Sequence, residues 1–279
     1  VLRLPQVGID DSFFDLGGDS ISSILLVSRA RKAGIVITPR HVFQHQSVAA
    51  LAAAAASINA PDNSVDVAVG PISATPIIKW VMARGGPLRR FSQSMLLQMP
   101  AGMKEQHLAT ALQTLVDHHD ALRLQLIAPS GSSAWGFSVQ PVGTTNASAC
   151  LQHIDIIGLD EPARRACIGE ATSAAQERLD PEAGCMLQAV WFDAGEKHAG
   201  RVLLMLHHLV VDGVSWRILV PDLEAAWQAA LCGEQAKLPP RSTSLRRWAQ
   251  KLSEEAMRPN RVAELPLWQS IVDAPDALL

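Results

Sequence analysis

The stretch RVLLMLHHLVVDG at residues 201–213 decides the fold of the larger part of the chain. Its first six residues form an apolar run, which predicts a buried β-strand. Adjacent side chains on a strand point to opposite faces. We therefore expect one of His207 and His208 to pack into the protein while the other faces a cleft. Asp212-Gly213 predicts a sharp turn, where the backbone comes close to another group.

Helices and strands are mixed along the sequence around this stretch, from Pro71 onward. A helix opens at Thr75-Pro76 and stops at Gly85-Gly86-Pro87. Ser215 is placed to cap the helix that follows the turn. Further strands are predicted at 91–99, 122–128, 136–140 and 186–192, and further helices at 104–119, 161–179, 215–231, 242–257 and 263–271. This mixture predicts an α/β layer domain.

The first part of the chain predicts a small helical bundle. One helix is capped by Asp19 or Ser20 and closed by Gly34. A second opens at Thr38-Pro39, and a third runs from about Ser47 through the alanines. A shift to Asn, Pro, Asp and Ser then marks a linker. The expected domains are a helical unit at 1–58, a linker at 59–70 and a layer domain at 71–279.

The composition is that of a globular protein. With 279 residues, of which 48% are hydrophobic and 18% charged, the chain can bury the core of one large or two modest domains. The net charge of -3 gives no electrostatic reason to expect nucleic acid or an anionic membrane as a partner. No apolar run is long enough to span a bilayer, and no secretory signal is visible. Four scattered cysteines indicate reduced thiols and a cytoplasmic protein.

Two sites carry possible chemistry. Gly17-Gly18-Asp19-Ser20 presents a hydroxyl where a helix begins, and the positive end of a helix favours a phosphate there. The alternative is that Asp19 and Ser20 only cap the helix. The histidine pair at 207–208 can move protons, because an imidazole titrates near neutral pH. The alternative is that both histidines are structural.

Two other histidine pairs are interpreted as structural. His118 and His119 end a helix with strong apolar spacing. His41 and His45 lie four residues apart, a spacing used by metal sites, but no third ligand is apparent. We therefore expect no metal site.

The run Phe13-Phe14-Asp15-Leu16-Gly17-Gly18-Asp19-Ser20-Ile21 resembles the attachment motif of peptidyl carrier (thiolation) domains in non-ribosomal peptide synthetases, which make secondary metabolites such as antibiotics. The resemblance implies that a phosphopantetheinyl transferase moves 4′-phosphopantetheine from coenzyme A to Ser20. The terminal thiol would then carry an aminoacyl or peptidyl thioester. A full carrier has another helix before this motif, so we expect a carrier truncated at its N-terminus.

The run His207-His208-Leu209-Val210-Val211-Asp212-Gly213 resembles the His-His-x-x-x-Asp-Gly signature of the condensation-domain superfamily, whose fold is like that of chloramphenicol acetyltransferase. The resemblance implies that His208 is catalytic, with His207, Asp212 and Gly213 as supporting residues. Asp212 is expected to pair with a buried arginine such as Arg123. Landmarks of the epimerization branch are Asp19 before the serine, Val214–Leu219, Thr75-Pro76-Ile77, Phe91-Ser92-Gln93-Ser94, Leu238-Pro239-Pro240 with Thr243-Ser244, and Glu264–Trp268.

For the epimerization branch, the resemblance implies that His208 removes or returns the Cα proton of a carrier-bound residue and so converts it from L to D. Such a domain has a second lobe that brings a glutamate, so we expect a first lobe alone, inactive by itself, working with adjacent synthetase domains. Two alternatives stay open. A condensation domain would use the same histidine to form a peptide bond, and a carrier and docking fragment would use its histidines only to hold the fold.

Overall fold

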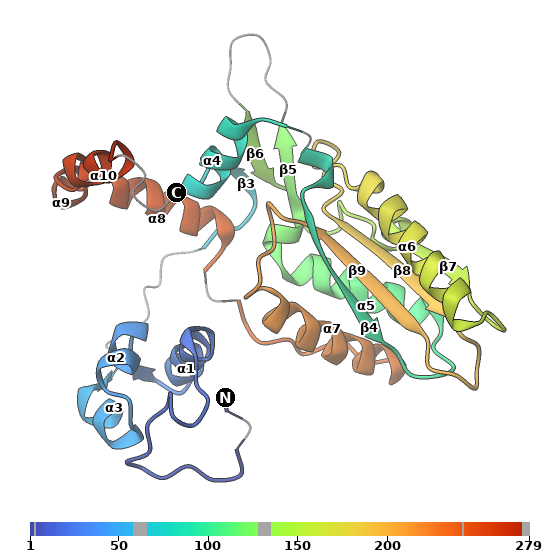
Figure 1. Ribbon diagram of the computed structural model, residues 1–279, viewed down its shortest axis with the longest axis horizontal. Helices are drawn as coiled ribbons and strands as arrows, with labels where there is room; N and C mark the ends of the chain where they lie inside the picture. The colour runs from blue at the N-terminus through green and yellow to red at the C-terminus, as the bar shows by residue number, and fades with distance from the viewer. Residues whose placement is uncertain (3, 58–65, 87, 128–134, 242, 275–279) are drawn as a thin grey trace. The chain divides into compact units, whose positions relative to one another are not determined.

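The computed structural model describes residues 1–2, 4–57, 66–86, 88–127, 135–241 and 243–274 (Figure 1). The chain divides into two compact units, at 1–65 and 66–279. Residues 59–65 of the expected linker lie outside the described residues. Residues 66–70 lie in the second unit, where Asp66 accepts hydrogen bonds from the backbone N–H and the hydroxyl of Ser244. The expected domain boundaries stay a prediction.

The first unit contains three helices, as predicted from its caps. They are α1 (Ser20–Lys32), α2 (Pro39–Gln44) and α3 (Val48–Ala54). The side chains of Asp19, Thr38 and Ser47 each accept a backbone N–H in the first turn of the helix that follows. Two short strands, which the sequence pattern did not predict, pair antiparallel: β1 (Ile35–Val36) and β2 (Ala56–Ser57). Phe13, Ile37 and Val42 form the small core.

The second unit is built on a four-stranded sheet (Figure 1). In spatial order its strands are β4 (Ser92–Gln98), β9 (Arg201–His207), β8 (Leu187–Asp193) and β7 (Leu151–Asp155). The β7–β8 pair is parallel and the other two pairs are antiparallel. A mixed sheet of this kind fits helices on both faces.

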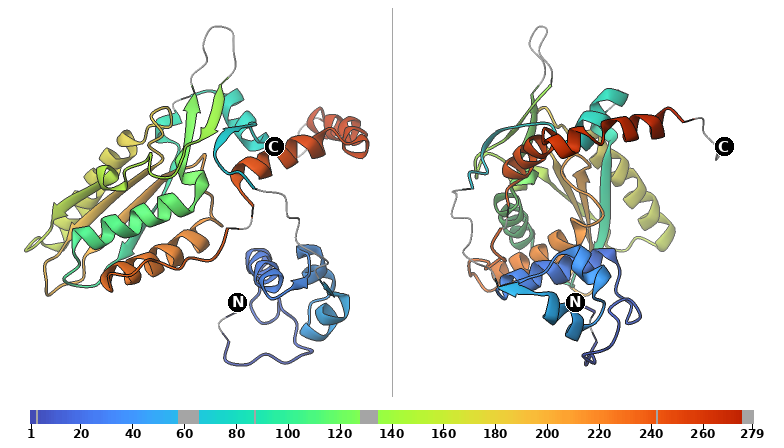
Figure 2. Two further views of the ribbon diagram at one scale, coloured as in Figure 1. Left: turned by 180° about the vertical axis from the view of Figure 1, so that it is seen from behind. Right: turned by 90° about the vertical axis from the view of Figure 1, so that its left-hand side faces the viewer.

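Helices cover both faces of this sheet, as Figures 1 and 2 show from opposite sides. They are α5 (Glu105–His118) and α7 (Trp216–Leu231) on one face and α6 (Glu161–Arg178) on the other. The side chains of β9 alternate between the two cores. Val202, Leu204 and Leu206 pack with α5 and α7, whereas Leu203 and Met205 pack with α6. This alternation sends successive residues at the end of β9 to different faces.

A second sheet has three antiparallel strands, ordered β3 (Gly70–Ile72), β6 (Gly136–Val139) and β5 (Leu124–Ile127). The helices α4 (Pro76–Arg84) and α8 (Leu245–Ala256) contribute to its core. The short helices α9 (Pro259–Val262) and α10 (Leu265–Val272) follow α8, and single 3₁₀ turns lie at η1 (Leu88–Arg90), η2 (Asp120–Arg123) and η3 (Ala147–Cys150).

The predicted mixed helix and strand architecture is confirmed, with one helical unit and one layered unit. The sequence pattern missed β3 and β7. In the described parts of the chain, every helix is too short or too polar to cross a membrane.

Candidate active site

His207 ends β9 on the face covered by α6, and its side chain is fully buried. Its Nε2 donates to the Leu88 carbonyl oxygen at 2.8 Å, and its Nδ1 accepts the backbone N–H of Leu209 at 3.2 Å. Burial lowers the pKa of His207, and the Leu88 carbonyl opposes this only in part. Both ring nitrogens are thus occupied within the protein. His207 joins η1 to the end of the strand.

His208 is the next residue, and its side chain is partly exposed. Its ring stacks on Phe91, with centroids 4.6 Å apart and planes 19° apart. Its Nδ1 lies 2.7 Å from the Val211 carbonyl oxygen, and its Nε2 lies 3.1 Å from Nε2 of Gln93. The expectation that one of the two histidines packs into the protein is confirmed by the buried His207 ring, and the cleft expected beside the other stays a prediction.

Gln93 lies on β4, where it pairs in register with Leu206 of β9. Its Oε1 accepts the indole N–H of Trp216, the first residue of α7, at 2.9 Å. The sequence pattern indicates no role for Gln93 beyond its place in the Phe91-Ser92-Gln93-Ser94 landmark. The contact between Gln93 and His208 joins residues that lie 115 positions apart in the sequence, so no local sequence pattern predicts it.

Asp212 organises the turn that leads from β9 to α7. Its Oδ1 accepts the Val214 N–H at 3.1 Å, the Ser215 N–H at 2.8 Å and the Ser215 hydroxyl at 2.7 Å. Burial raises the pKa of this carboxyl, but the hydrogen bonds from Ser215 and Val214 outweigh burial, and the pKa is lowered. The expected helix cap at Ser215 is wrong, because the Ser215 side chain makes no cap hydrogen bond to α7.

Gly213 is exposed, and a Cβ placed on it would meet no atom within 4 Å. Its φ lies outside the left-handed region. The expected close approach of the backbone at this turn is therefore absent from the described residues.

The expected pairing of Asp212 with Arg123 is wrong. Arg123 is almost fully buried and donates to the carbonyls of Val116, Asp117 and Gln140, at 2.6, 2.8 and 3.0 Å. Burial lowers the pKa of Arg123, and the carboxylates of Asp120 and Asp117 oppose this effect. Since Val116 and Asp117 lie in the last turn of α5, Arg123 satisfies carbonyls that the helix end leaves without partners.

The second histidine pair joins two helices. His119 Nε2 lies 2.9 Å from the Asp222 carboxylate of α7, and the rings of His118 and His119 meet edge to face at 4.9 Å. Burial lowers the pKa of His119, and the attraction of Asp222 opposes this only in part. The ligand atoms of these three residues lie within 4.8 Å of one another. His41 and His45 lie on α2 with ring centroids 6.4 Å apart.

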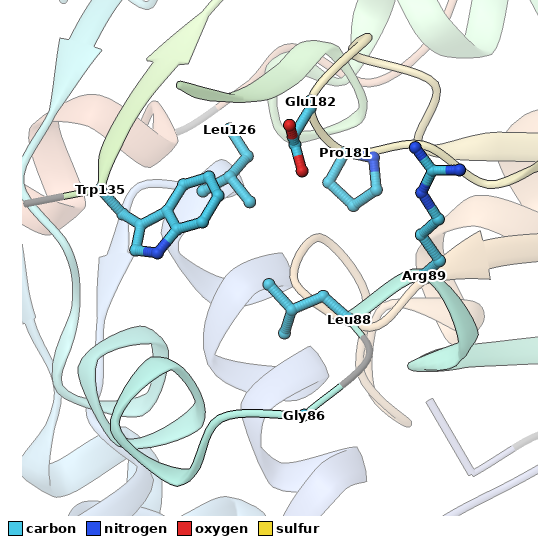
Figure 3. A pocket seen from close by; sticks show the side chains of 7 residues that line it. All are labelled: Gly86, Leu88, Arg89, Leu126, Trp135, Pro181 and Glu182. Atoms are coloured by element: carbon cyan, nitrogen blue, oxygen red, sulfur yellow. The ribbon is translucent and has the colours of Figure 1, made fainter. Parts of the chain in front are cut away.

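A pocket of about 170 Å³ lies elsewhere in the second unit (Figure 3). Its lining is mainly apolar, with the charged groups of Arg89 and Glu182: Gly86, Leu88, Arg89, Leu126, Trp135, Pro181 and Glu182. His208 is not one of these residues, but the carbonyl oxygen of Leu88, one of the lining residues, contacts the His207 ring.

In the first unit, Ser20 is the exposed first residue of α1. Asp19 and Ser22 cap the helix reciprocally, so the cap does not use the Ser20 hydroxyl. The preceding turn needs its glycines. Gly17 has a φ of 87°, and a Cβ on Gly18 would lie 2.4 Å from the Phe13 ring. The packed turn therefore presents the hydroxyl to solvent.

Comparison with known families decides the class of this chain. The model of the condensation domain matches residues 88–278. The chain belongs to the condensation-domain family. The model of the phosphopantetheine attachment site matches residues 1–55. The expected order of a carrier followed by a condensation-superfamily domain is therefore confirmed. The condensation family is a family of enzymes.

The relatives of this condensation-family chain are large peptide synthetases. One linear gramicidin synthase polypeptide of Brevibacillus parabrevis is 38% identical over 275 residues, which cover 98% of this chain and 5% of that protein. Tyrocidine synthase 2 of the same organism is 31% identical over 274 residues, which cover 97% of this chain and 7% of that protein. The chain thus spans a small part of these relatives.

Two solved structures resemble the condensation-family unit. The epimerization domain from the third module of tyrocidine synthetase B is 27% identical with a TM-score of 0.67, over 79% of this chain and 47% of that chain. The first condensation domain of the calcium-dependent antibiotic synthetase is 16% identical with a TM-score of 0.60, over 75% of this chain and 49% of that chain. The second likeness shows the fold alone.

The attachment domain fits the 4′-phosphopantetheine that it holds covalently. An exposed hydroxyl at the first position of a 13-residue helix can accept a phosphodiester, and the N–H groups and dipole of the first turn favour the negative charge. The glycines at 17 and 18 add no side chain beside it.

Proposed function

We propose that Ser20 carries phosphopantetheine and that the condensation-family unit inverts the Cα configuration of the residue tethered to it, with His208 as the proton-transferring group. The observation that carries this proposal is the state of His208. The Val211 carbonyl can only accept a hydrogen bond, so Nδ1 of His208 bears the proton and Nε2 keeps its lone pair. A partly exposed imidazole with a basic nitrogen is suited to general base catalysis.

When bound, phosphopantetheine presents the substrate as a thioester, which acidifies the neighbouring Cα–H. Nε2 of His208 accepts this proton while the C–H electron pair stays with the substrate. The Val211 carbonyl then holds the imidazolium through Nδ1–H. Inversion needs a proton delivered to the opposite face by a second acid, for which the family resemblance implies a glutamate. Asp212 contributes by fixing the turn after Val211.

Epimerization is favoured by the similarity to a solved epimerization domain, which is 27% identical, whereas the similar solved condensation domain is 16% identical. Condensation is the second candidate, because the matched family model is that of the condensation domain and is compatible with both reactions. In that reaction the same imidazole would assist an amine that attacks the thioester. The substrates, adjacent synthetase domains and coenzyme A belong to the proposal in both cases.

The two reactions are separated by following the carrier-bound product in D₂O. The full-length protein that contains this chain is loaded with an L-aminoacyl group and incubated with and without a second loaded carrier. Epimerization gives a D-residue with one deuterium at Cα, measured by chiral chromatography and mass spectrometry. A dipeptide without deuterium uptake would overturn the proposal in favour of condensation.

His208→Ala is the decisive variant in this assay, with His198→Ala as its matched control, because His198 is an exposed histidine after β8. We expect His208→Ala to lose about 10²–10⁴-fold in deuterium exchange and His198→Ala to keep it. Exchange that is unchanged in His208→Ala would refute the role of His208.

Attachment at Ser20 has its own test. The chain is incubated with coenzyme A and a phosphopantetheinyl transferase, and the mass gain of one phosphopantetheine is mapped by peptide mass spectrometry. Ser20→Ala should abolish the gain, and Ser28→Ala, which alters an exposed serine of the same helix, should retain it. A gain that persists in Ser20→Ala would place the attachment elsewhere.

A further inference from the structure

We propose that Gln93 is a positioning residue that fixes His208 in the tautomer with a proton on Nδ1 and a bare Nε2. This inference rests on the proposed function, which makes His208 the proton-transferring group. It starts from a continuous line of hydrogen bonds: Trp216 Nε1 to Gln93 Oε1 at 2.9 Å, Gln93 Nε2 to His208 Nε2 at 3.1 Å, and His208 Nδ1 to the Val211 carbonyl at 2.7 Å.

The direction of every bond in this line is set at its two ends. The Trp216 indole can only donate, so Gln93 must turn its oxygen toward Trp216 and its NH₂ toward His208. An NH₂ group needs an acceptor, so Nε2 of His208 must offer its lone pair. At the other end, the Val211 carbonyl can only accept, which places the imidazole proton on Nδ1. Both ends demand the same tautomer.

The two ends are also held firmly. Trp216 and Val211 are both buried, and both belong to the core that α5 and α7 share with the sheet. Gln93 is fixed in turn by the register of β4 against β9. If the Gln93 amide were reversed, its NH₂ would face the Trp216 N–H, and a proton would be needed on Nε2 of His208. With a reversed Gln93 amide, this NH₂ and the Trp216 N–H would be two donors facing each other, and His208 would need protons on both ring nitrogens.

This geometry has a consequence for the proton transfer. Nε2 has one lone pair, so the Gln93 N–H must give up its hydrogen bond when the substrate proton arrives. The imidazolium that forms then points its Nε2–H toward the Gln93 NH₂, and the two donors repel. Gln93 thus offers no acceptor to Nε2–H, so the transferred proton stays available for return to the substrate.

The test reads the tautomer directly, without turnover. The full chain is labelled with ¹⁵N-histidine, and long-range ¹H–¹⁵N spectra at pH 7 distinguish a bare ring nitrogen from a protonated one. The signals of His208 are assigned by their loss in His208→Ala. In the neutral ring of the wild-type chain we expect the proton on Nδ1 only. A ring with its proton on Nε2, or an even mixture of the two tautomers, would overturn the inference.

Gln93→Glu is the variant with the sharpest expected outcome. A carboxylate only accepts, so one oxygen accepts the Trp216 N–H and the other accepts a hydrogen bond from a protonated Nε2 of His208. His208 should become a doubly protonated imidazolium, and its Nε2 signal should move to the protonated range. Gln98→Glu places the same change on an exposed position of β4 and should leave the His208 signals in place. An unchanged Nε2 signal in folded Gln93→Glu would refute the role of Gln93.

Trp216→Phe is a second variant that tests the role of Gln93 if Gln93→Glu does not fold. It removes only the N–H that orients the Gln93 amide, while the Val211 carbonyl still favours a proton on Nδ1, so we expect the tautomer with its proton on Nε2 to appear as a minor population. A single tautomer in folded Trp216→Phe would show that Val211 alone sets the proton. Should both variants unfold, the wild-type spectrum still decides whether the predicted tautomer is present.

Activity of the full-length protein then separates the two proposals. Gln93→Glu should lower kcat for Cα exchange by about 10²-fold or more with little change in KM, because the base is protonated before substrate arrives. If Gln93→Glu changes neither the His208 signals nor the activity, while His208→Ala is inactive, the role of Gln93 is refuted and the role of His208 in proton transfer stands. If the wild-type spectrum shows the expected tautomer but His208→Ala keeps full activity, the proposed function is refuted and the inference about the tautomer stands.

Discussion

The two histidine pairs of the second unit, at 118–119 and 207–208, consist of the same dipeptide and differ in the partners of the second imidazole. His119 contacts the Asp222 carboxylate, whereas His208 contacts the Val211 carbonyl and the Gln93 amide. The Asp222 carboxylate accepts a hydrogen bond from the His119 ring and ties it to α7, while burial holds the pKa of His119 below its usual value. A neutral acceptor on one nitrogen and a neutral donor on the other leave a lone pair. The partners therefore separate a structural histidine from a proposed base.

The strongest way to break this comparison is to remove each second histidine in turn. His208→Ala should reduce Cα exchange by about 10²–10⁴-fold with little change in folding. His119→Ala should lower the free energy of unfolding, and the folded fraction should keep its exchange rate. Both are measured by exchange in D₂O together with urea unfolding. Equal losses of exchange per folded molecule in the two variants would remove the distinction.

The Asp222 carboxylate offers the next largest effect. Asp222→Ala leaves His119 without its partner in a largely buried contact between α5 and α7, so we expect the free energy of unfolding to fall by about 1–3 kcal/mol. Urea denaturation measures this loss. Glu224→Ala, on the exposed side of α7, is the matched control and should change stability little. If Asp222→Ala leaves the free energy of unfolding unchanged, the contact between His119 and Asp222 does not stabilise the packing of α5 and α7.

A smaller effect is expected at the turn beside His208. Asp212→Ala removes three acceptor contacts that cap the start of α7, which should cost about 1 kcal/mol in the free energy of unfolding. Asp212→Asn retains the acceptor oxygen and should recover most of that loss. Thermal unfolding of the two variants decides this point. An equal loss in both would mean that the charge, and not the acceptor, holds the turn.

The gentlest test of the comparison is pH. Burial lowers the pKa of both His207 and His119 in the folded chain, so the unfolded state binds more protons below about pH 6.5. The free energy of unfolding should therefore fall as the pH is lowered from 7.5 to about 5. The lowered pKa of Asp212 adds a loss in the same direction, but only below about pH 4. Urea midpoints across this range measure the slope, and a rise in stability toward pH 5 would contradict it.

The sequence predicted what is local. A continuous apolar run placed β9, the alternation of side chains along a strand separated His207 from His208, and cap residues placed α1, α2 and α4. The strands β3 and β7 escaped notice because both are short, and the exposed face of β7 gives no clean alternation. The locations of the predicted helices and strands follow from neighbours along the chain.

Contacts between distant residues could not be predicted in the same way. The partners of Arg123 are backbone carbonyls, which every residue offers, so the sequence does not mark them. Charge matching alone pointed to Asp212, and the structure places that carboxylate in a turn of its own. Gln93 reaches His208 across 115 residues through the register of two strands. Such pairings become visible only when the sheet order is known.

The hydrogen bonds of Arg123 to the last turn of α5 affect how the molecule responds to a change of pH. A guanidinium keeps its charge at any acidity a cell reaches, and three main-chain oxygens hold it. His119, which directly follows α5, gains and loses a proton, whereas the contacts of Arg123 with these oxygens do not depend on pH. Arg123 therefore keeps the end of α5 in place while the contact between His119 and Asp222 changes with acidity.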